Sequence, residues 1–358
     1  MLKRLKKKDL KHRSKISEQQ ARFIAFVIVI PVFVILLVNF VFTADDTVDA
    51  EAFVDLQEGA QAFSGFRRAH AKGMCVNGYF RSNAQLQGYS RADVFKQGEY
   101  PIIGRFSIAG NNPYANDLNA PVRSLAFVIN PESNSQWRVA MNTPPVMAVK
   151  TPQAFFQQLQ ALQALPDTGK PDPEKIKAFF EAHPESASFL EWKSNYSPTA
   201  SFALEKYHSI NAFYLVNDSK QKQAARFHAQ PRLSQPLVAP IESDGPDALQ
   251  QQLLAQLNQG DLNFDLVFTL ANEQDDETDP TVLWPEERRQ IVAGEIIIKQ
   301  AVPQQDGACF DINFNPLILP DGIQATEDPI LKARSASYAE SYKRRSQEML
   351  LQAISGGD

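Results

Sequence analysis

The chain has 358 residues, of which 44% are hydrophobic and 22% charged, and its formal net charge is −5. This composition allows a large core in one or two domains and excludes a disordered or fibrous chain. The charge is uneven, because residues 1–22 carry a net charge of +7 and the rest of the chain is acidic. An acidic body argues against nucleic acid as a partner.

The chain begins with this basic tail, which is followed by an apolar run at residues 23–43, FIAFVIVIPVFVILLVNFVFT. A helix of 21 residues covers roughly 30 Å, the thickness of the hydrocarbon core of a bilayer. With lysines before the run and acidic residues after it, we expect one transmembrane helix and a cytoplasmic tail at residues 1–22. The body would then lie on the periplasmic or extracytoplasmic side of the cytoplasmic membrane. A cleaved signal peptide is the alternative, but the run is long and FTADD lacks a small-residue cleavage pattern.

Residues 44–64 are small and acidic and predict a juxtamembrane linker with a short helix near residues 50–62. The remainder, residues 65–358, is expected to form one domain. Runs rich in β-branched and aromatic residues, separated by turn sequences, predict antiparallel strands. They lie at residues 73–80, 102–109, 122–130, 136–142, 210–216, 223–229, 262–271 and 290–300.

Helices are expected where the apolar period changes and proline opens a segment. They are predicted at residues 152–165, 173–183, 186–194 and 246–258, and a long final helix runs from Pro329 to about residue 354. Asp328 is placed to cap that final helix. Eight antiparallel strands can close into a barrel that has no exposed edges. We therefore predict an α+β fold, an eight-stranded antiparallel barrel with a helical insert and a C-terminal helix.

Two local patterns bear on chemistry. His70 leads into a glycine-punctuated strand in RRAHAKGMCVNGYF, and imidazole is the side chain that moves protons near neutral pH. Arg334 and Tyr338 stand four residues apart on the final helix and therefore share one face. Tyrosine ionises at about pH 10, so it is an anionic metal ligand only where a positive charge stabilises it. Taken singly, each pattern is also common among packed or surface residues.

Several other chemistries have no local support in this sequence. The chain lacks GxGxxG, GxxxxGK[ST], HExxH and GxSxG, so dinucleotide, P-loop, zincin and hydrolase functions are not indicated. Cys75 and Cys309 lack the spacing of a zinc site. They could form a disulfide in an exported domain, but two separate buried cysteines are the simpler interpretation, and the sequence does not decide between them.

Six segments together resemble the catalase family, in the same order along the chain. Residues 67–80 resemble the catalase strand RxxHAKGxxxxGxF. Residues 314–338, FNPLILPDGIQATEDPILKARSASY, resemble the catalase segment that ends on the Arg-x-x-x-Tyr motif of the haem ligand. The other segments are YPIIGRFSI at residues 100–108, APVRSLAF at 120–127, MNTPPVM at 141–147 and DPTVLWPEERRQIVAGEIII at 279–298. Met147 departs from the pattern, because it stands where the family usually has an aromatic residue.

The resemblance implies haem b as the cofactor, with Tyr338 as the ligand of its iron and Arg334 keeping that phenol ionised. It implies that His70 moves the proton of a peroxide and that Asn142 holds the peroxide by hydrogen bonds. It further implies that Ser107 orients His70. The arginines that would pair with the haem propionates are Arg67, Arg105 and Arg334.

The chain looks most like the short catalase-related peroxidases, since it lacks the N-terminal arm, wrapping segment and C-terminal domain of full-length catalases. We therefore expect reduction of hydrogen peroxide or organic peroxides by an organic electron donor, as a protection against oxidative stress, with weak or no catalase activity. One alternative is a hydroperoxide isomerase similar to the catalase-like allene oxide synthases. The other is a haem-binding carrier or sensor without turnover. The oligomeric state stays open.

Overall fold

The computed structural model describes residues 48–236 and 245–355 of the chain. The expected tail and transmembrane helix at residues 1–43 lie outside these ranges. Within them, every helix is too short or too polar to cross a bilayer.

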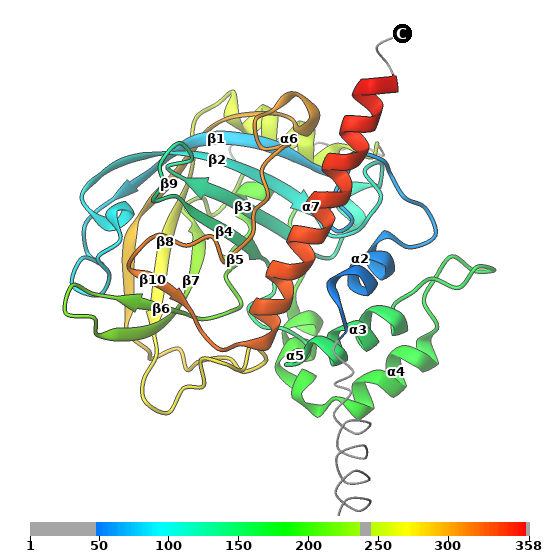
Figure 1. The fold of residues 1–358 in the computed structure, drawn as a ribbon, viewed down its shortest axis with the longest axis horizontal. Helices are drawn as coiled ribbons and strands as arrows, with labels where there is room; N and C mark the ends of the chain where they lie inside the picture. Colours follow the sequence, from blue (N-terminus) through cyan, green and yellow to red (C-terminus); the bar gives the residue numbers. More distant parts are fainter. Residues whose placement is uncertain (1–47, 237–244, 356–358) are drawn as a thin grey trace, which may run out of the picture. The chain divides into compact units, whose positions relative to one another are not determined.

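The centre of the described chain is a single antiparallel sheet of ten strands (Figure 1). Pairing follows the order β7-β5-β4-β3-β2-β1-β9-β8, and β8 pairs back with β7, so these eight strands close into a barrel. Strands β6 and β10 extend the sheet beyond β7. The strands are β1 Gly73–Ser82, β2 Gly98–Ile108, β3 Arg123–Ile129, β4 Trp137–Asn142, β5 Tyr207–His208, β6 Phe213–Val216, β7 Lys222–Pro231, β8 Leu262–Leu270, β9 Gln290–Pro303 and β10 Ile323–Ala325.

The predicted eight-stranded barrel is confirmed, although its membership differs from the expectation at one strand. Residues 210–216 were expected to form a single barrel strand, but Ile210 has a φ of 66°. A β-branched residue in the left-handed region cannot continue a strand. The chain therefore makes the short strand β5 before this point, which enters the barrel, and β6 after it, which pairs with β10 outside the ring.

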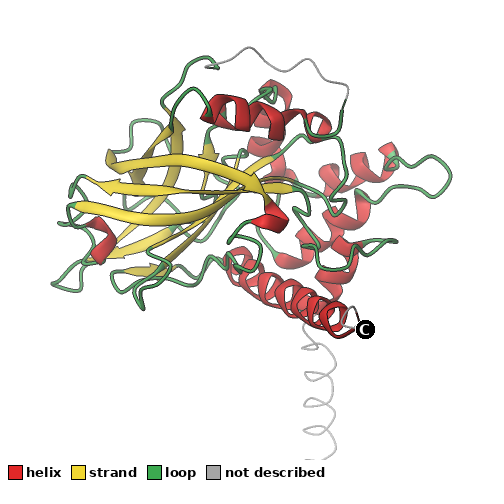
Figure 2. Ribbon diagram, turned by 90° about the horizontal axis from the view of Figure 1, so that it is seen from above, coloured by secondary structure: helices red, strands yellow, loops and turns green. Residues whose placement is uncertain are grey.

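Six α-helices of the described residues lie around the barrel, and Figure 2 shows most helices gathered beyond one end of the strands. They are α2 Ala50–Glu58, α3 Pro152–Ala161, α4 Pro173–Ala182, α5 Ala187–Asn195, α6 Ala248–Leu257 and α7 Pro329–Ser355. Helix α7 crosses the outside of the barrel and packs against α2 and α3 (Figure 1). Asp328 caps it as expected, since Oδ1 accepts a 2.8 Å hydrogen bond from the amide of Ile330.

Strand β1 packs closely on β2 and is covalently linked to the segment after β9. Gly73, at its first position, has no space for a side chain, because a Cβ atom there would lie 2.2 Å from the carbonyl oxygen of Phe106 and 2.8 Å from the guanidinium of Arg105. Cys75 on the same strand forms a disulfide with Cys309, with Cα atoms 5.3 Å apart. The structure thus settles the choice that the sequence left open: the cysteines are paired, across 234 residues of chain.

Candidate functional site

A cavity lies between the barrel and the helices that pack against it, and it collects every site residue that the sequence singled out. About 1220 Å³ of space lies between its walls, part of it continuous with solvent. Concave, partly enclosed spaces of this kind are where proteins usually bind cofactors and small substrates. Its walls come from α2, the segment before β1, strands β2 to β4, α3, the segment of residues 312–314 and α7.

His70 is held in this wall by its backbone, which has a φ of 56°. Few residues other than glycine adopt this left-handed conformation, and it persists only where neighbouring groups fix it. Arg105 on β2 holds the His70 backbone in this conformation, because its Nη2 donates to the carbonyl oxygens of His70 at 2.8 Å and of Ala71 at 3.3 Å. Gln304 completes the brace: its Oε1 accepts from Arg105 Nε at 3.1 Å and its Nε2 donates to Ala71 at 2.8 Å.

The surroundings of His70 keep its imidazole neutral. Burial lowers its pKa to about 4, and the positive charges of Arg105, Arg334 and Arg67 add to the effect. An imidazole that is neutral at pH 7 has one ring nitrogen free to accept a proton. His70 can therefore act as a base in this cavity, which is the role that the resemblance implied.

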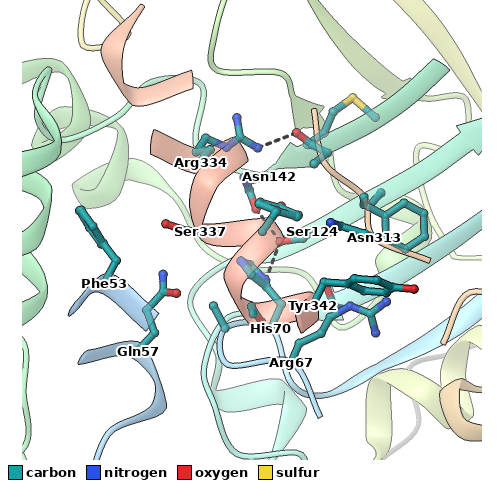
Figure 3. A pocket seen from close by; sticks show the side chains of 18 of the residues that line it. Phe53, Gln57, Arg67, His70, Ser124, Asn142, Asn313, Arg334, Ser337 and Tyr342 are labelled. Carbon is teal, nitrogen blue, oxygen red and sulfur yellow. Dashed lines mark hydrogen bonds between the residues drawn. The ribbon is translucent and has the colours of Figure 1, made fainter. Parts of the chain in front are cut away.

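The side chain that touches the His70 ring is Ser124, and this corrects the expectation for Ser107. Ser107, Ser124 and Asn142 stand side by side on β2, β3 and β4 through the register of the barrel. From the middle of this row, Ser124 Oγ lies 3.1 Å from His70 Nδ1 and donates to Asn142 Oδ1 at 2.6 Å (Figure 3). Ser107 is buried and lines the cavity, but the hydrogen bond to the imidazole is made by Ser124.

At one end of the cavity, positive charge accumulates on Arg67, Arg105 and Arg345. Burial and the neighbouring cations Arg105 and Arg345 hold the pKa of Arg67 well below its usual value. Burial, with the charge of Arg345, lowers the pKa of Arg105 to about 9. Arg67 reaches across to the segment after Cys309 and donates to the carbonyl oxygens of Cys309 and Ile312, both at 2.9 Å.

Tyr338 and Arg334 line the same cavity from α7, one helical turn apart, as the sequence predicted. Tyr338 packs against the cluster of Cys75, Cys309 and Phe314. Arg334 donates to the carbonyl oxygen of Ala140 at 3.0 Å and to Asn211 Oδ1. These bonds tie α7 to β4 and to the segment between β5 and β6, so they fix where the Tyr338 ring enters the cavity.

The residues of the cavity fit an iron porphyrin. Arg105 and Arg345 are buried, Arg67 is partly buried, and none of the three forms an ion pair within the described residues. The Nε atom of Arg345 is also buried without a hydrogen-bond partner among the described residues, so a bound anion would be stabilised here. The carboxylates of a porphyrin would supply that charge and accept those hydrogen bonds. A phenol on α7 and an imidazole just before β1 line the same cavity, so the two groups would lie near a metalloporphyrin bound there.

Sequence reasoning missed two residues of the site, and only one of them left a signal. Arg345 follows Tyr338 by seven residues, which is two turns of a helix, so the same spacing argument that paired Arg334 with Tyr338 would have found it. No sequence pattern marks Ser124 as a site residue, because its contact with His70 depends on the pairing of β2, β3 and β4.

Three comparisons with known proteins agree with this geometry. The family model described as "Catalase" matches residues 65–352. A catalase-related peroxidase from Synechococcus elongatus is 35% identical over 283 residues, which cover 78% of this chain and 84% of that protein. A second, from Mycolicibacterium paratuberculosis, is 27% identical over 307 residues, covering 85% of this chain and 95% of that protein.

Among solved structures, a bacterial catalase superimposes with a TM-score of 0.68 at 19% sequence identity. The match covers 79% of this chain and 58% of that one, so this chain spans a little over half the length of that catalase. At this identity the likeness concerns the fold alone.

Proposed function

The chain belongs to the catalase family, and from that premise we propose that it is a haem b-dependent peroxidase. It would reduce hydrogen peroxide or organic hydroperoxides with an organic electron donor, with weak or no catalase activity, and so protect the cell against oxidative stress. The observation that carries the proposal is that His70 and Tyr338, 268 positions apart in the sequence, line one cavity. The names of the two relatives support peroxidase chemistry in particular.

Four side chains would hold the cofactor. The Tyr338 phenolate is the candidate iron ligand, and Arg67, Arg105 and Arg345 would bind the two propionates. When bound, the haem supplies the iron centre at which the O–O bond of the peroxide breaks. The sequence also suggested Arg334 as a propionate partner, but its bonds to Ala140 and Asn211 favour a role in placing α7.

The neutral imidazole of His70 would take the proton from one peroxide oxygen and return it to the departing oxygen, as a general base and then a general acid. Asn142 would hold the peroxide, because its Oδ1 already accepts from Ser124 and its Nδ2 is left to donate. Such proton transfers typically contribute about 10²–10⁴-fold to a rate.

The visible spectrum of the body, residues 45 onward, tests this proposal with and without Tyr338→Phe. We expect a ferric spectrum typical of tyrosinate ligation in the unchanged protein and its loss in the variant. A matched variant is Tyr342→Phe, one turn further along α7, which should keep the spectrum. If the unchanged protein, supplied with haem, shows no such spectrum, the cofactor assignment is wrong.

We also propose that residues 23–43 anchor the protein in the cytoplasmic membrane with the body outside the cytoplasm. The support is the length and flanking charge of that run, together with the Cys75–Cys309 disulfide, since disulfides persist mainly in oxidising compartments. Protease added to spheroplasts should degrade the body while leaving a cytoplasmic marker intact. Protection of the body in intact spheroplasts, followed by its digestion after lysis, would contradict this orientation.

A further inference from the structure

Helix α2 contributes to the cavity although it lies outside the stretch that matches the family. The family match begins at residue 65, whereas α2 spans Ala50–Glu58 and places Phe53 and Gln57 in the cavity wall. The helix is held against the body by ion pairs that include Asp55 with Arg344 at 2.6 Å and Glu58 with Arg68 at 2.7 Å. This wall therefore belongs to the folded body and not to a loose linker.

The α2 wall lies apart from the arginine end of the cavity. In Figure 3, Phe53 and Gln57 stand on one side of His70, and Arg67 and Tyr342 stand on the other. Carboxylates would bind at the arginine end, where the guanidinium groups can donate charge-assisted hydrogen bonds to them. The described residues Phe53, Gln57, Phe155 and Met147, which form the α2 end, are uncharged and suit a different chemical group.

The side chains at the α2 end are mainly apolar. Phe53 is only 3% exposed, and its ring packs on Phe155 at 5.8 Å and on Phe156 at 5.4 Å between centroids. Phe155 and Met147 line the cavity beside it, and the Gln57 amide provides a polar group. An apolar group that left water for this space would gain roughly 25 cal/mol for each Å² it buries.

We propose that Phe53 and Gln57 are specificity-determining residues, and that the α2 end of the cavity binds the organic group of an organic hydroperoxide. This inference rests on the proposed function and adds a binding site to it. In the reaction, ROOH and two donor molecules AH give ROH, water and two radicals A•. The peroxide oxygens would lie at His70 and Asn142, while R extends toward Phe53.

The chain path favours the hydroperoxide over the electron donor as the occupant. Met147 and Phe155 follow Asn142 in the sequence and line the same cavity, so the residue that would hold the peroxide and the wall at the α2 end share one space. A group attached to the peroxide can reach this wall without leaving the cavity. An electron donor, which reacts in a separate step, needs no contact with Asn142.

Steady-state kinetics can separate these occupants, because kcat/KM for peroxide and for donor are independent in a two-step peroxidase cycle. We would measure kcat/KM for cumene hydroperoxide, hydrogen peroxide and the donor guaiacol on the haem-loaded protein. One aromatic contact is worth about 0.5–1.5 kcal/mol. Phe53→Ala should therefore lower the ratio of kcat/KM for cumene hydroperoxide to kcat/KM for hydrogen peroxide about threefold to tenfold. Gln57→Leu, which makes the wall more apolar, should raise that ratio.

A binding measurement gives a readout that does not depend on turnover. The alcohol 2-phenylpropan-2-ol has the organic group of cumene hydroperoxide without its O–O bond, so calorimetry can report its Kd directly. Phe53→Ala should weaken this Kd by a factor similar to its effect on the kinetic ratio. Phe63→Ala is the matched control, since Phe63 belongs to the same segment but packs on Tyr114 outside the cavity lining.

Unchanged ratios in both Phe53→Ala and Gln57→Leu would overturn the inference, as would an effect confined to kcat/KM for guaiacol. The Gln57 variant keeps the test decisive if loss of the Phe53 ring unfolds α2. Failure of the proposed function looks different, because the unchanged protein would then lack either haem or activity with every peroxide.

Discussion

Ser124 Oγ lies 3.1 Å from His70 Nδ1, and the same hydroxyl donates its proton to Asn142 Oδ1 at 2.6 Å. Since that proton is already used, the hydroxyl can only accept from His70. This arrangement favours the tautomer with the proton on Nδ1, which leaves the lone pair of Nε2 for a substrate. One serine thus sets the tautomer of His70 and the orientation of the Asn142 amide (Figure 3).

Removing this hydroxyl should impair peroxide reduction through His70. We expect Ser124→Ala to lower kcat/KM for hydrogen peroxide about ten- to a hundredfold, because small misplacements of a catalytic group are costly. Ser124→Thr, which keeps a hydroxyl, should recover most of the rate. Ser107→Ala serves as the comparison and should cause the smaller loss, and a larger loss in Ser107→Ala would restore Ser107 as the residue that orients His70.

The rate of peroxide reduction should fall on the acid side as His70 takes up a proton. Burial and three arginines lower its pKa to about 4, from an ordinary 6.5. Bound propionates would offset the arginine charges but not the burial, so the acid limb of kcat/KM should lie between pH 4 and 6.5. His70→Gln should lower the rate of peroxide reduction about 10²–10⁴-fold while haem stays bound. An unchanged acid limb in the residual activity of that variant would assign it to another group.

Arg345 should contribute to haem retention. A hydrogen bond to a charged group is worth about 1.5–3 kcal/mol, so Arg345→Gln should speed haem loss to an excess of an acceptor protein by about ten- to a hundredfold. Lys343→Gln, an exposed position two residues earlier on α7, is the control and should match the unchanged protein. Equal rates of haem loss in the two variants would show that no propionate reaches Arg345.

The disulfide should stabilise both the fold and the cofactor site. Removing a native disulfide typically costs about 2–5 kcal/mol, and the loop closed here is long. The double variant Cys75→Ser, Cys309→Ser should therefore unfold at lower denaturant concentration. It should also lose haem faster, because Arg67 bonds to the carbonyl oxygen of Cys309. A reductant should shift the unfolding midpoint of the unchanged protein and leave the double variant unaffected.

Two further histidines make the folded state sensitive to acid. Burial and the charge of Lys206 lower the pKa of His208 to about 4 and that of His228 to about 3, and their rings lie 5.9 Å apart. The unfolded chain takes up these protons near pH 6.5 but the folded chain does not. Stability should therefore be complete above pH 6.5 and fall as the pH drops toward 4. His228→Gln should flatten the dependence of Tm on pH in this window.

The sequence by itself predicted the local elements and the residues that face one another within them. β-branched and aromatic runs gave the long strands β1 to β4 and β7 to β9, and Pro-capped apolar periods gave the helices. Helical spacing placed Arg334 and Tyr338 on one face, and the resemblance of six segments to catalases implied haem. These features depend on dihedral preference and periodicity within about thirty residues, which the order of amino acids specifies directly.

Only the tertiary structure decided contacts between segments far apart in the chain. It paired Cys75 with Cys309 and placed β5, not β6, in the barrel. It also placed Ser124, not Ser107, beside the imidazole of His70 and brought Phe53 of α2 to the cavity. A shift of one residue in the pairing of two neighbouring strands changes which side chains they bring together. No local sequence pattern encodes that register. It follows from closing the whole ring at once, with its core packed and its backbone groups paired.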